Sequence, residues 1–204
     1  MIAQDQEIAN KAIFIDFDGT LCHDRFWRSL KPELLEKVQH SLFQDDKTVV
    51  GAWMNGDYTS EDVNRKLAEA LDVDYDFLWN VFVKDCREMR VEMKVLEKLK
   101  RLRKNHKVVL ITDNMDCFDR FTVPSLELDT YFDVIVNSFN EHASKNEQDG
   151  LLFKEVIKRV GSTPTNSVLI DNSKTSCDLF EALGGVSFFA TNERPLGYWL
   201  NDIV

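Results

Sequence analysis

The sequence predicts an α/β protein in which a doubly wound parallel sheet carries a small helical unit. Three observations support this class: short apolar, β-branched runs recur along the chain, helical patterns separate most of them, and residues 22–93 break the alternation with an almost wholly helical stretch. With 204 residues and 44% hydrophobic content, the chain is long enough for one packed core with a small inserted partner.

The first strand and the insertion after it define the expected domain organisation. The apolar run Ala12–Ile15 reads as a strand buried on both faces. The helical stretch that follows lies between the first and second strands, where it can cover the strand ends. We therefore assign residues 22–93 to a helical cap, and residues 1–21 and 94–204 to the α/β core.

Within the cap, local signals indicate where the helices begin. Helices are expected to start near Arg25 and Lys31. Thr59 and Asp62 form a capping-box pattern before an apolar stripe at i, i+4, i+7 and i+8 spacing. Asp74 is a candidate N-cap for the next helix.

After the insertion, helices and strands alternate. Met93–Lys104 has apolar residues at helical spacing, and its last turns are rich in Lys and Arg, which favours a solvated helix C-terminus over an anion-binding patch. The remaining elements are strands at Lys107–Thr112, Phe132–Val136, Ser167–Ile170 and Val186–Ala190, a helix around Phe153–Val160, and a helix that stops at Gly184-Gly185.

Charge and cysteine content exclude several classes of protein. Acids outnumber bases 35 to 25, and the formal charge of −10 argues against binding to nucleic acid or to an anionic membrane. The four cysteines lie far apart without a CxxC pair, so neither a zinc site nor a disulfide framework is expected. The N-terminus lacks a signal-peptide core, and no apolar segment approaches the roughly 20 residues that span a bilayer. We expect a soluble, cytoplasmic protein; its oligomeric state leaves no mark in the sequence.

The strongest chemical signal is the pair of carboxylates that ends the first strand. Asp16 and Asp18 are followed at once by Gly19 and Thr20, so the chain turns where the strand ends. Open α/β sheets bind their ligands at the carboxyl ends of their strands. Two carboxylates held this close repel each other unless a cation or a proton intervenes, which is typical of an active site. The structural alternative is a plain turn in which Asp18 only caps a helix.

Further polar residues follow the other strands. Thr112-Asp113-Asn114 ends the second strand, Asp171-Asn172-Ser173 ends the fourth, and Lys145 lies in a polar loop after the third. Because the carboxyl ends of parallel strands meet at one edge of a sheet, we expect acids, a hydroxyl and an ammonium around one crevice. That set of groups suits phosphoryl transfer.

With these motifs the chain resembles the haloacid dehalogenase (HAD) superfamily, and specifically its phosphohydrolases with a helical cap after the first motif. The DxDGT motif is intact at residues 16–20, Thr112 fits the second motif, Lys145 the third, and Asp171-Asn172 the fourth. The resemblance implies a Rossmann-like sheet with the strand order 3-2-1-4-5.

The resemblance also implies a Mg²⁺-dependent phosphatase that acts on a small phosphorylated metabolite. Asp16 would attack phosphorus to form an aspartyl-phosphate, and Asp18 would protonate the leaving oxygen and then activate water. Mg²⁺ would offset the repulsion between phosphate and carboxylate, about 4 kcal/mol per charge pair at 4 Å and an effective dielectric of 20. The implied metal ligands are the Asp16 carboxylate, the Asp18 carbonyl, Asp171 and Asn172, and the implied phosphate contacts are Thr112, Asp113, Asn114 and Lys145.

Several of these positions have alternative interpretations. Thr112 can simply cap the following helix, and Lys145 can be a solvated surface lysine, with nearby Lys154 as the alternative for the third motif. His23 and Arg25 can touch substrate, although surface or helix-cap roles are more frequent for such residues.

Asn172 departs from the family, because many members carry a metal-ligating Asp at this position. An amide offers a neutral carbonyl oxygen but no charge, so we expect weaker Mg²⁺ binding than in a relative with two acids. Two alternatives to a phosphatase stay open. One, allowed by this departure, is a non-catalytic module that binds a phospho-ligand or a protein. The other is a phosphomutase, which would form the same aspartyl-phosphate intermediate. Dehalogenase activity is disfavoured, because displacement of a halide from carbon does not require the acid/base Asp18.

Overall fold

The computed structural model describes residues 11–45, 47–201 and 203. Five parallel strands form one sheet in the order β3-β2-β1-β4-β5, which confirms the order implied by the resemblance. The strands are β1 (Ala12–Ile15), β2 (Lys107–Thr112), β3 (Val134–Asn137), β4 (Ser167–Asp171) and β5 (Val186–Phe189). β3 begins two residues later than predicted, because the Phe132 N–H bonds back to the Leu128 carbonyl (3.1 Å) instead of joining the sheet.

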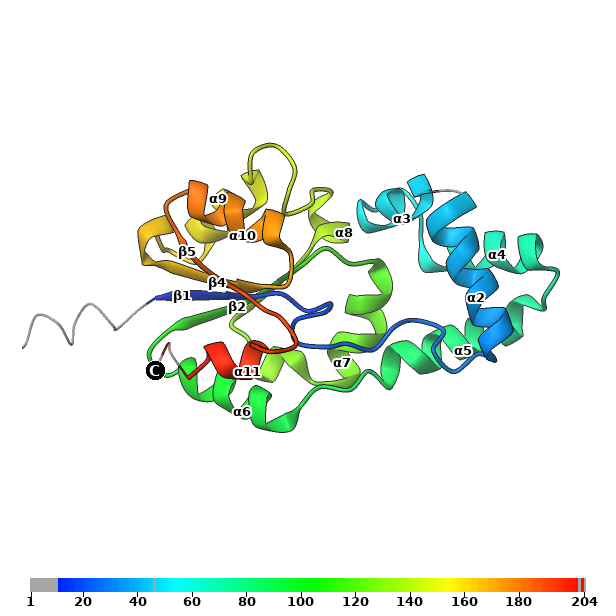
Figure 1. Ribbon diagram of the computed structural model, residues 1–204, viewed down its shortest axis with the longest axis horizontal. Helices are drawn as coiled ribbons and strands as arrows, with labels where there is room; N and C mark the ends of the chain where they lie inside the picture. The colour runs from blue at the N-terminus through cyan, green and yellow to red at the C-terminus, as the bar shows by residue number, and fades with distance from the viewer. Residues whose placement is uncertain (1–10, 46, 202, 204) are drawn as a thin grey trace, which may run out of the picture.

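Helices cover both faces of the sheet (Figure 1). One face carries α6 (Met93–Leu102) and α11 (Leu196–Trp199), and the other carries α9 (Leu151–Arg159) and α10 (Lys174–Ala182). Successive side chains of a strand point to opposite faces, so Ile13 and Phe14 of β1 belong to two different core clusters, although both are fully buried. The central strand is therefore apolar throughout, as the uninterrupted run predicted.

Short helical turns complete the core. They are η2 (Phe118–Thr122), α7 (Val123–Ser125), η3 (Leu128–Thr130), α8 (Ser138–Glu141) and η4 (Pro164–Asn166).

A second group of helices lies beyond the carboxyl ends of the strands (Figure 1). It consists of α2 (Pro32–His40), η1 (Ser41–Asp45), α3 (Lys47–Met54), α4 (Ser60–Leu71) and α5 (Tyr75–Arg87). These helices share their own aromatic core, in which the rings of Trp27 and Trp53 lie 4.8 and 5.9 Å from that of Phe82. We refer to this group as the cap. Its division from the core at residues 22 and 93 stays a prediction.

Two cap helices start where the sequence predicts. The Thr59 hydroxyl accepts a hydrogen bond from the Asp62 N–H, and the Asp62 carboxylate accepts one from the Thr59 N–H (3.0 Å), which confirms the capping box of α4. The Asp74 carboxylate accepts from the Phe77 N–H (2.7 Å) at the start of α5. Both signals are local, so no tertiary information was needed to find them.

The helix expected near Arg25 does not form, and that prediction was wrong. Trp27 takes a left-handed backbone conformation with φ of 57°, which a continuous α-helix excludes. Contacts with the end of α5 hold this turn: the Ser29 N–H donates to the Asp85 carboxylate (2.8 Å), and Arg28 donates to the Asp85 carbonyl (2.7 Å). The segment therefore serves as a connection between core and cap.

A buried acid ties the cap to the core. Asp116, which follows β2, accepts hydrogen bonds from Trp53 Nε1 (2.9 Å) and from the N–H (3.0 Å) and hydroxyl (2.6 Å) of Ser60 in the cap. Its second oxygen accepts from Arg120 (2.7 Å), which also pairs with Glu61. The first turn of α4 is thus fixed to the segment that follows β2.

Within the part of the chain that the structure describes, no helix has the length and apolarity to cross a membrane. All four cysteines are buried with free thiols.

Candidate active site

Asp16 is held at the carboxyl end of β1 by contacts on both carboxylate oxygens. Its backbone N–H donates to the Ile170 carbonyl of β4 (3.1 Å), so the residue continues the sheet. Oδ1 accepts from Lys145 Nζ (2.7 Å), and Oδ2 accepts from the Thr20 hydroxyl (3.0 Å). The side chain is almost fully buried, and this burial raises the pKa of Asp16 to about 7, while Lys145 opposes the rise. The carboxylate is therefore oriented before any ligand arrives.

Lys145 bridges two buried acids. Its ammonium lies 2.7 Å from both Asp16 Oδ1 and Asp171 Oδ2, and only 4% of the residue is exposed. Burial alone would lower the pKa of Lys145, but the neighbouring carboxylates outweigh it and hold the pKa above its ordinary value. Lys154, the alternative for this position, is exposed on α9. The structure thus brings Lys145, and not Lys154, to the two acids.

Asp18 lies in the tight turn that follows β1 and lines a cavity at the mouth of the site. Gly19 adopts φ of 83°, and its N–H donates to the Cys22 carbonyl (2.7 Å). The Asp18 side chain is 48% exposed and pairs with the Arg25 guanidinium. Partial desolvation of the carboxyl group by the surrounding protein raises the pKa of Asp18, and the positive charge of Arg25 opposes the rise.

The two residues at the cap entrance occupy different places. Arg25 is exposed, as the surface interpretation expects, and it also contacts the predicted acid/base group, a pairing across a turn that leaves no sequence pattern. His23 is exposed and does not line the cavity beside Asp18.

Three of the groups predicted to bind Mg²⁺ converge. One terminal atom of the Asn172 amide lies 3.2 Å from both Asp16 Oδ2 and the Asp18 carbonyl oxygen. With its nitrogen in that place, the amide donates to both oxygens; with its oxygen there, the amide oxygen lies close to two other oxygens, an arrangement that a cation would stabilise. Neighbouring ligands of an octahedral Mg²⁺ with 2.1 Å bonds stand about 3 Å apart, so this spacing and chemistry fit the ion.

Asp171 is placed differently from the other three metal candidates. It is fully buried, its Oδ2 pairs with Lys145, and its Oδ1 accepts from the Ser173 N–H (2.7 Å). Asp171 therefore joins the site through Lys145, and its role as a metal ligand stays a prediction. Among the described residues, no three His, Cys, Asp or Glu side chains gather as a metal cluster. The converging set instead contains one carboxylate, one backbone carbonyl and one amide.

The predicted phosphate contacts end β2, and one of them is unpaired. Thr112 is fully buried, and its hydroxyl has no hydrogen-bond partner among the described residues. The Asp113 carboxylate accepts from the Lys145 N–H (2.9 Å), so it fixes the lysine loop. The Asn114 N–H, expected to face phosphate, donates to the Ser138 hydroxyl (3.1 Å). Ser138 has no motif around it, so the sequence offered no signal for this contact.

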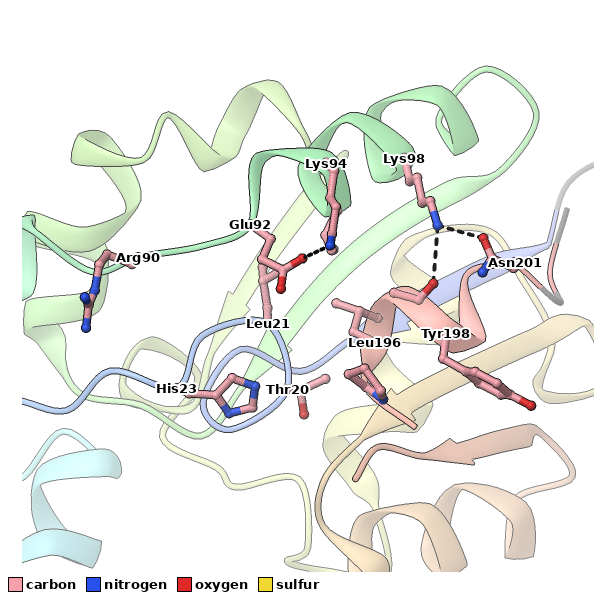
Figure 2. Close-up of a pocket in the computed structure, with 13 residues that line it drawn as sticks. Thr20, Leu21, His23, Arg90, Glu92, Lys94, Lys98, Leu196, Tyr198 and Asn201 are labelled. Atoms are coloured by element: carbon pink, nitrogen blue, oxygen red, sulfur yellow. Dashed lines mark hydrogen bonds and ion pairs between the residues drawn. The ribbon is translucent and has the colours of Figure 1, made fainter. Parts of the chain in front are cut away.

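Two cavities border the loop at residues 16–22. The larger, about 490 Å³, lies beside α6 and α11, and Figure 2 shows two of its basic side chains paired, Lys94 with Glu92 (2.9 Å) and Lys98 with Asn201 (2.6 Å). Of the motif residues, only Thr20 lines it.

The second cavity, about 290 Å³, lies between the core and the cap. Asp18, Asp113 and Asn114 line it, so it is the cavity that opens onto the candidate acid/base residue. We refer to it as the cap cavity.

Comparisons with solved structures find the same fold in other proteins. The chain aligns with a HAD family enzyme from Bacteroides thetaiotaomicron, crystallised with magnesium and inorganic phosphate, at 20% identity and a TM-score of 0.68, over 89% of this chain and 94% of that one. A structure described as a predicted HAD-like family hydrolase from Porphyromonas gingivalis aligns at 17% identity and a TM-score of 0.72, over 90% and 92%. A 2-haloacid dehalogenase from Pseudomonas syringae aligns at 15% and 0.64, over 95% and 97%.

At these identities the solved structures establish the fold alone. A comparison with curated protein sequences gives no match. The model of the haloacid dehalogenase-like hydrolases, in contrast, matches residues 10–178, which is most of the chain. Together with the DxDGT loop and the parallel sheet, this match shows that the protein belongs to the haloacid dehalogenase-like hydrolase family.

Proposed function

We propose that the protein is a Mg²⁺-dependent phosphatase that hydrolyses a small phosphorylated metabolite through an aspartyl-phosphate on Asp16. The observation that carries the proposal is the Asp18 carboxyl group, half-exposed at the cap cavity and two residues from the buried nucleophile. An alkoxide that leaves phosphorus needs a proton, whereas a halide that leaves carbon does not. A carboxylic acid at this place therefore favours phosphate esters over haloacids.

The chain's own residues account for both halves of the reaction. Asp16, oriented by Lys145 and Thr20, forms a bond to phosphorus while the bond from phosphorus to the leaving oxygen breaks and Asp18 protonates that oxygen. Asp18, now a carboxylate, takes a proton from water as the water oxygen attacks phosphorus. The Asp16–phosphorus bond then breaks, and inorganic phosphate is released. Thr112, with its unpaired hydroxyl, can donate to a phosphoryl oxygen.

Asp16, the Asp18 carbonyl and Asn172 would hold Mg²⁺. Bound there, the ion supplies positive charge that offsets the repulsion between the phosphate and the carboxylates. The Bacteroides relative, crystallised with magnesium and inorganic phosphate, supports this proposal by analogy.

A substrate panel tests the proposal. Wild type is incubated with phosphorylated metabolites and a generic aryl phosphate, in Mg²⁺ and in chelator, beside an Asp16→Asn variant. We expect phosphate release that requires Mg²⁺ and disappears in the variant. Equal behaviour of wild type and variant across the panel would contradict it and favour the non-catalytic module.

Two further arms address the other enzymes. Dehalogenases are among the similar structures, and one of these holds covalently bound chloropropionic acid, so 2-chloropropionate is included. Chloride release without phosphate release would establish the dehalogenase instead. Conversion of one sugar-phosphate isomer into another, without net release of phosphate, would establish a phosphomutase.

A further inference from the structure

We infer that the substrate is a phosphate monoester with an apolar leaving group, aromatic or alkyl, which binds in the cap cavity. The inference rests on the proposed phosphatase function and adds the class of substrate.

The walls of the cap cavity are mainly apolar. Phenylalanine and methionine supply half of the lining residues, including Phe26, Phe43 and Met54 from the cap side and Met115 and Phe118 from the segment after β2. Aromatic rings and thioethers offer polarisable contact to an apolar group, and methionine adapts to its shape. The cavity opens on Asp18, so its occupant is the group that receives the proton.

The polar side chains in this wall already have partners within the protein. Asp24 accepts two hydrogen bonds from the Arg90 side chain (2.7 and 2.9 Å). The Thr122 hydroxyl donates to a backbone carbonyl (2.9 Å), and the Asp113 carboxylate accepts a backbone N–H (2.9 Å). A sugar or nucleoside placed here would bury several hydroxyl groups against a mainly apolar wall whose polar side chains are partly engaged within the protein, which is unfavourable.

A smaller cavity extends the apolar space into the cap. It measures about 180 Å³, shares Phe26, Phe43 and Val50 with the cap cavity, and ends among Trp27 and Trp53. A dry cavity of about 150 Å³ is enough for benzene, so the cap cavity takes a substituted ring or a branched chain, and its extension admits a longer one.

Phe43 lies at the wall common to both spaces and is 57% exposed. An exposed aromatic ring beside a cavity gains apolar contact when a ligand covers it. The basic cavity of Figure 2 is the alternative place for a polar substrate, but Asp18, which lines the cap cavity, does not line it.

A series of alkyl phosphates isolates the effect of apolar area. Methyl, propyl and hexyl phosphate release alcohols of similar acidity, so the chemistry of the leaving group is nearly constant while the buried area grows. We expect kcat/KM to rise about fourfold for each buried methylene. Glycerol phosphate, which matches propyl phosphate in carbon number but adds two hydroxyls, should react more slowly than propyl phosphate.

The outcomes separate the two proposals. Mg²⁺-dependent release that is flat along the series, or faster for glycerol phosphate than for propyl phosphate, would overturn the apolar leaving group and leave the phosphatase intact. No release from any ester, the aryl phosphate included, would overturn both.

Variants of single cavity residues test whether the dependence of kcat/KM on alkyl length arises in the cap cavity. Phe43→Ala should lower the ratio of kcat/KM for hexyl over methyl phosphate by on the order of fivefold, since one apolar wall is lost. Phe77→Ala is the control: Phe77 is 50% exposed on α5 and lines neither cavity, so the ratio should not change. Val50→Phe, which fills the shared wall, should flatten the series beyond propyl phosphate. Equal ratios in wild type, Phe43→Ala and Val50→Phe would contradict the inference.

Discussion

Replacing Asn172 with Asp tests how the amide shapes the proposed metal site. In the protein without metal, the amide nitrogen can donate to both Asp16 Oδ2 and the Asp18 carbonyl, each 3.2 Å away. A carboxylate at the same place donates nothing and brings a second negative charge beside Asp16. We therefore expect Asn172→Asp to be less stable without Mg²⁺ and to bind Mg²⁺ more tightly.

The geometry sets the size of the effect. Two unit charges 3.2 Å apart repel by about 5 kcal/mol at an effective dielectric of 20 and by about 1 kcal/mol in water. Asn172 is exposed on its outer side, so we take about 2 kcal/mol. For a chain of this size that loss lowers Tm by about 4–8 °C. Relief of the same repulsion by Mg²⁺ corresponds to roughly thirtyfold tighter binding.

Calorimetric titration with Mg²⁺ and thermal unfolding with and without the ion measure both quantities. The matched control is Asn105→Asp, which makes the same change of charge on an exposed turn before β2, at the end of the sheet away from the site. We expect this control to match wild type in Tm and Mg²⁺ affinity. Equal Mg²⁺ affinities for wild type and Asn172→Asp would refute the reasoning. So would a difference in Tm between these two proteins that is as large in saturating Mg²⁺ as without the ion.

Three other predictions concern single residues. Lys145→Met leaves the buried carboxylates of Asp16 and Asp171 without their cation. Urea unfolding should therefore show a free energy of unfolding lower by at least about 3 kcal/mol, and phosphate release should stop. Lys154→Met, at an exposed lysine, is the control and should change neither quantity. Burial lowers the pKa of His106, so its contribution to the free energy of unfolding should fall as pH drops below 6.5; in urea titrations at about pH 7.5 and 5.5, wild type should therefore lose stability relative to His106→Gln at the lower pH. Gly19→Ala places a Cβ against the Asn172 side chain, the predicted amide ligand, so calorimetry should show weaker Mg²⁺ binding. Gly161→Ala is the control, because Gly161 also has a positive φ but has open space around it; this variant carries the backbone strain without the steric overlap and should bind Mg²⁺ as wild type does.

The fold followed from local patterns. β2 was predicted residue for residue, since a continuous apolar run between polar flanks has few other interpretations. The starts of α4 and α5 were found through the side chains of Thr59 and Asp74, which act within three residues of themselves. The turn at Trp27 was missed because contacts with a segment more than fifty residues away impose it.

The same distinction applies to the candidate site. Asp16 and Asp171 come together because they stand at the carboxyl ends of the neighbouring strands β1 and β4, and Lys145 reaches both from the loop after β3, at the same edge of the sheet. The Arg25–Asp18 pair and the contact of Ser138 with the segment after β2 depend on where single side chains meet, and no periodicity encodes that. The strand order was therefore predictable through the family resemblance, and pairing between side chains was not.

The hydrogen bonds that Asp116 accepts from Trp53 and Ser60, which form a joint between core and cap, have a consequence for engineering the protein. This joint locks the first turn of α4 to the segment after β2, so substitutions at Ser60 or Trp53 would disturb the same segment that carries the candidate phosphate contacts. Phe43 and Val50 lie in the cap cavity without forming part of that joint. Libraries aimed at new substrates should therefore vary η1 and the middle of α3, and leave the start of α4 as it is.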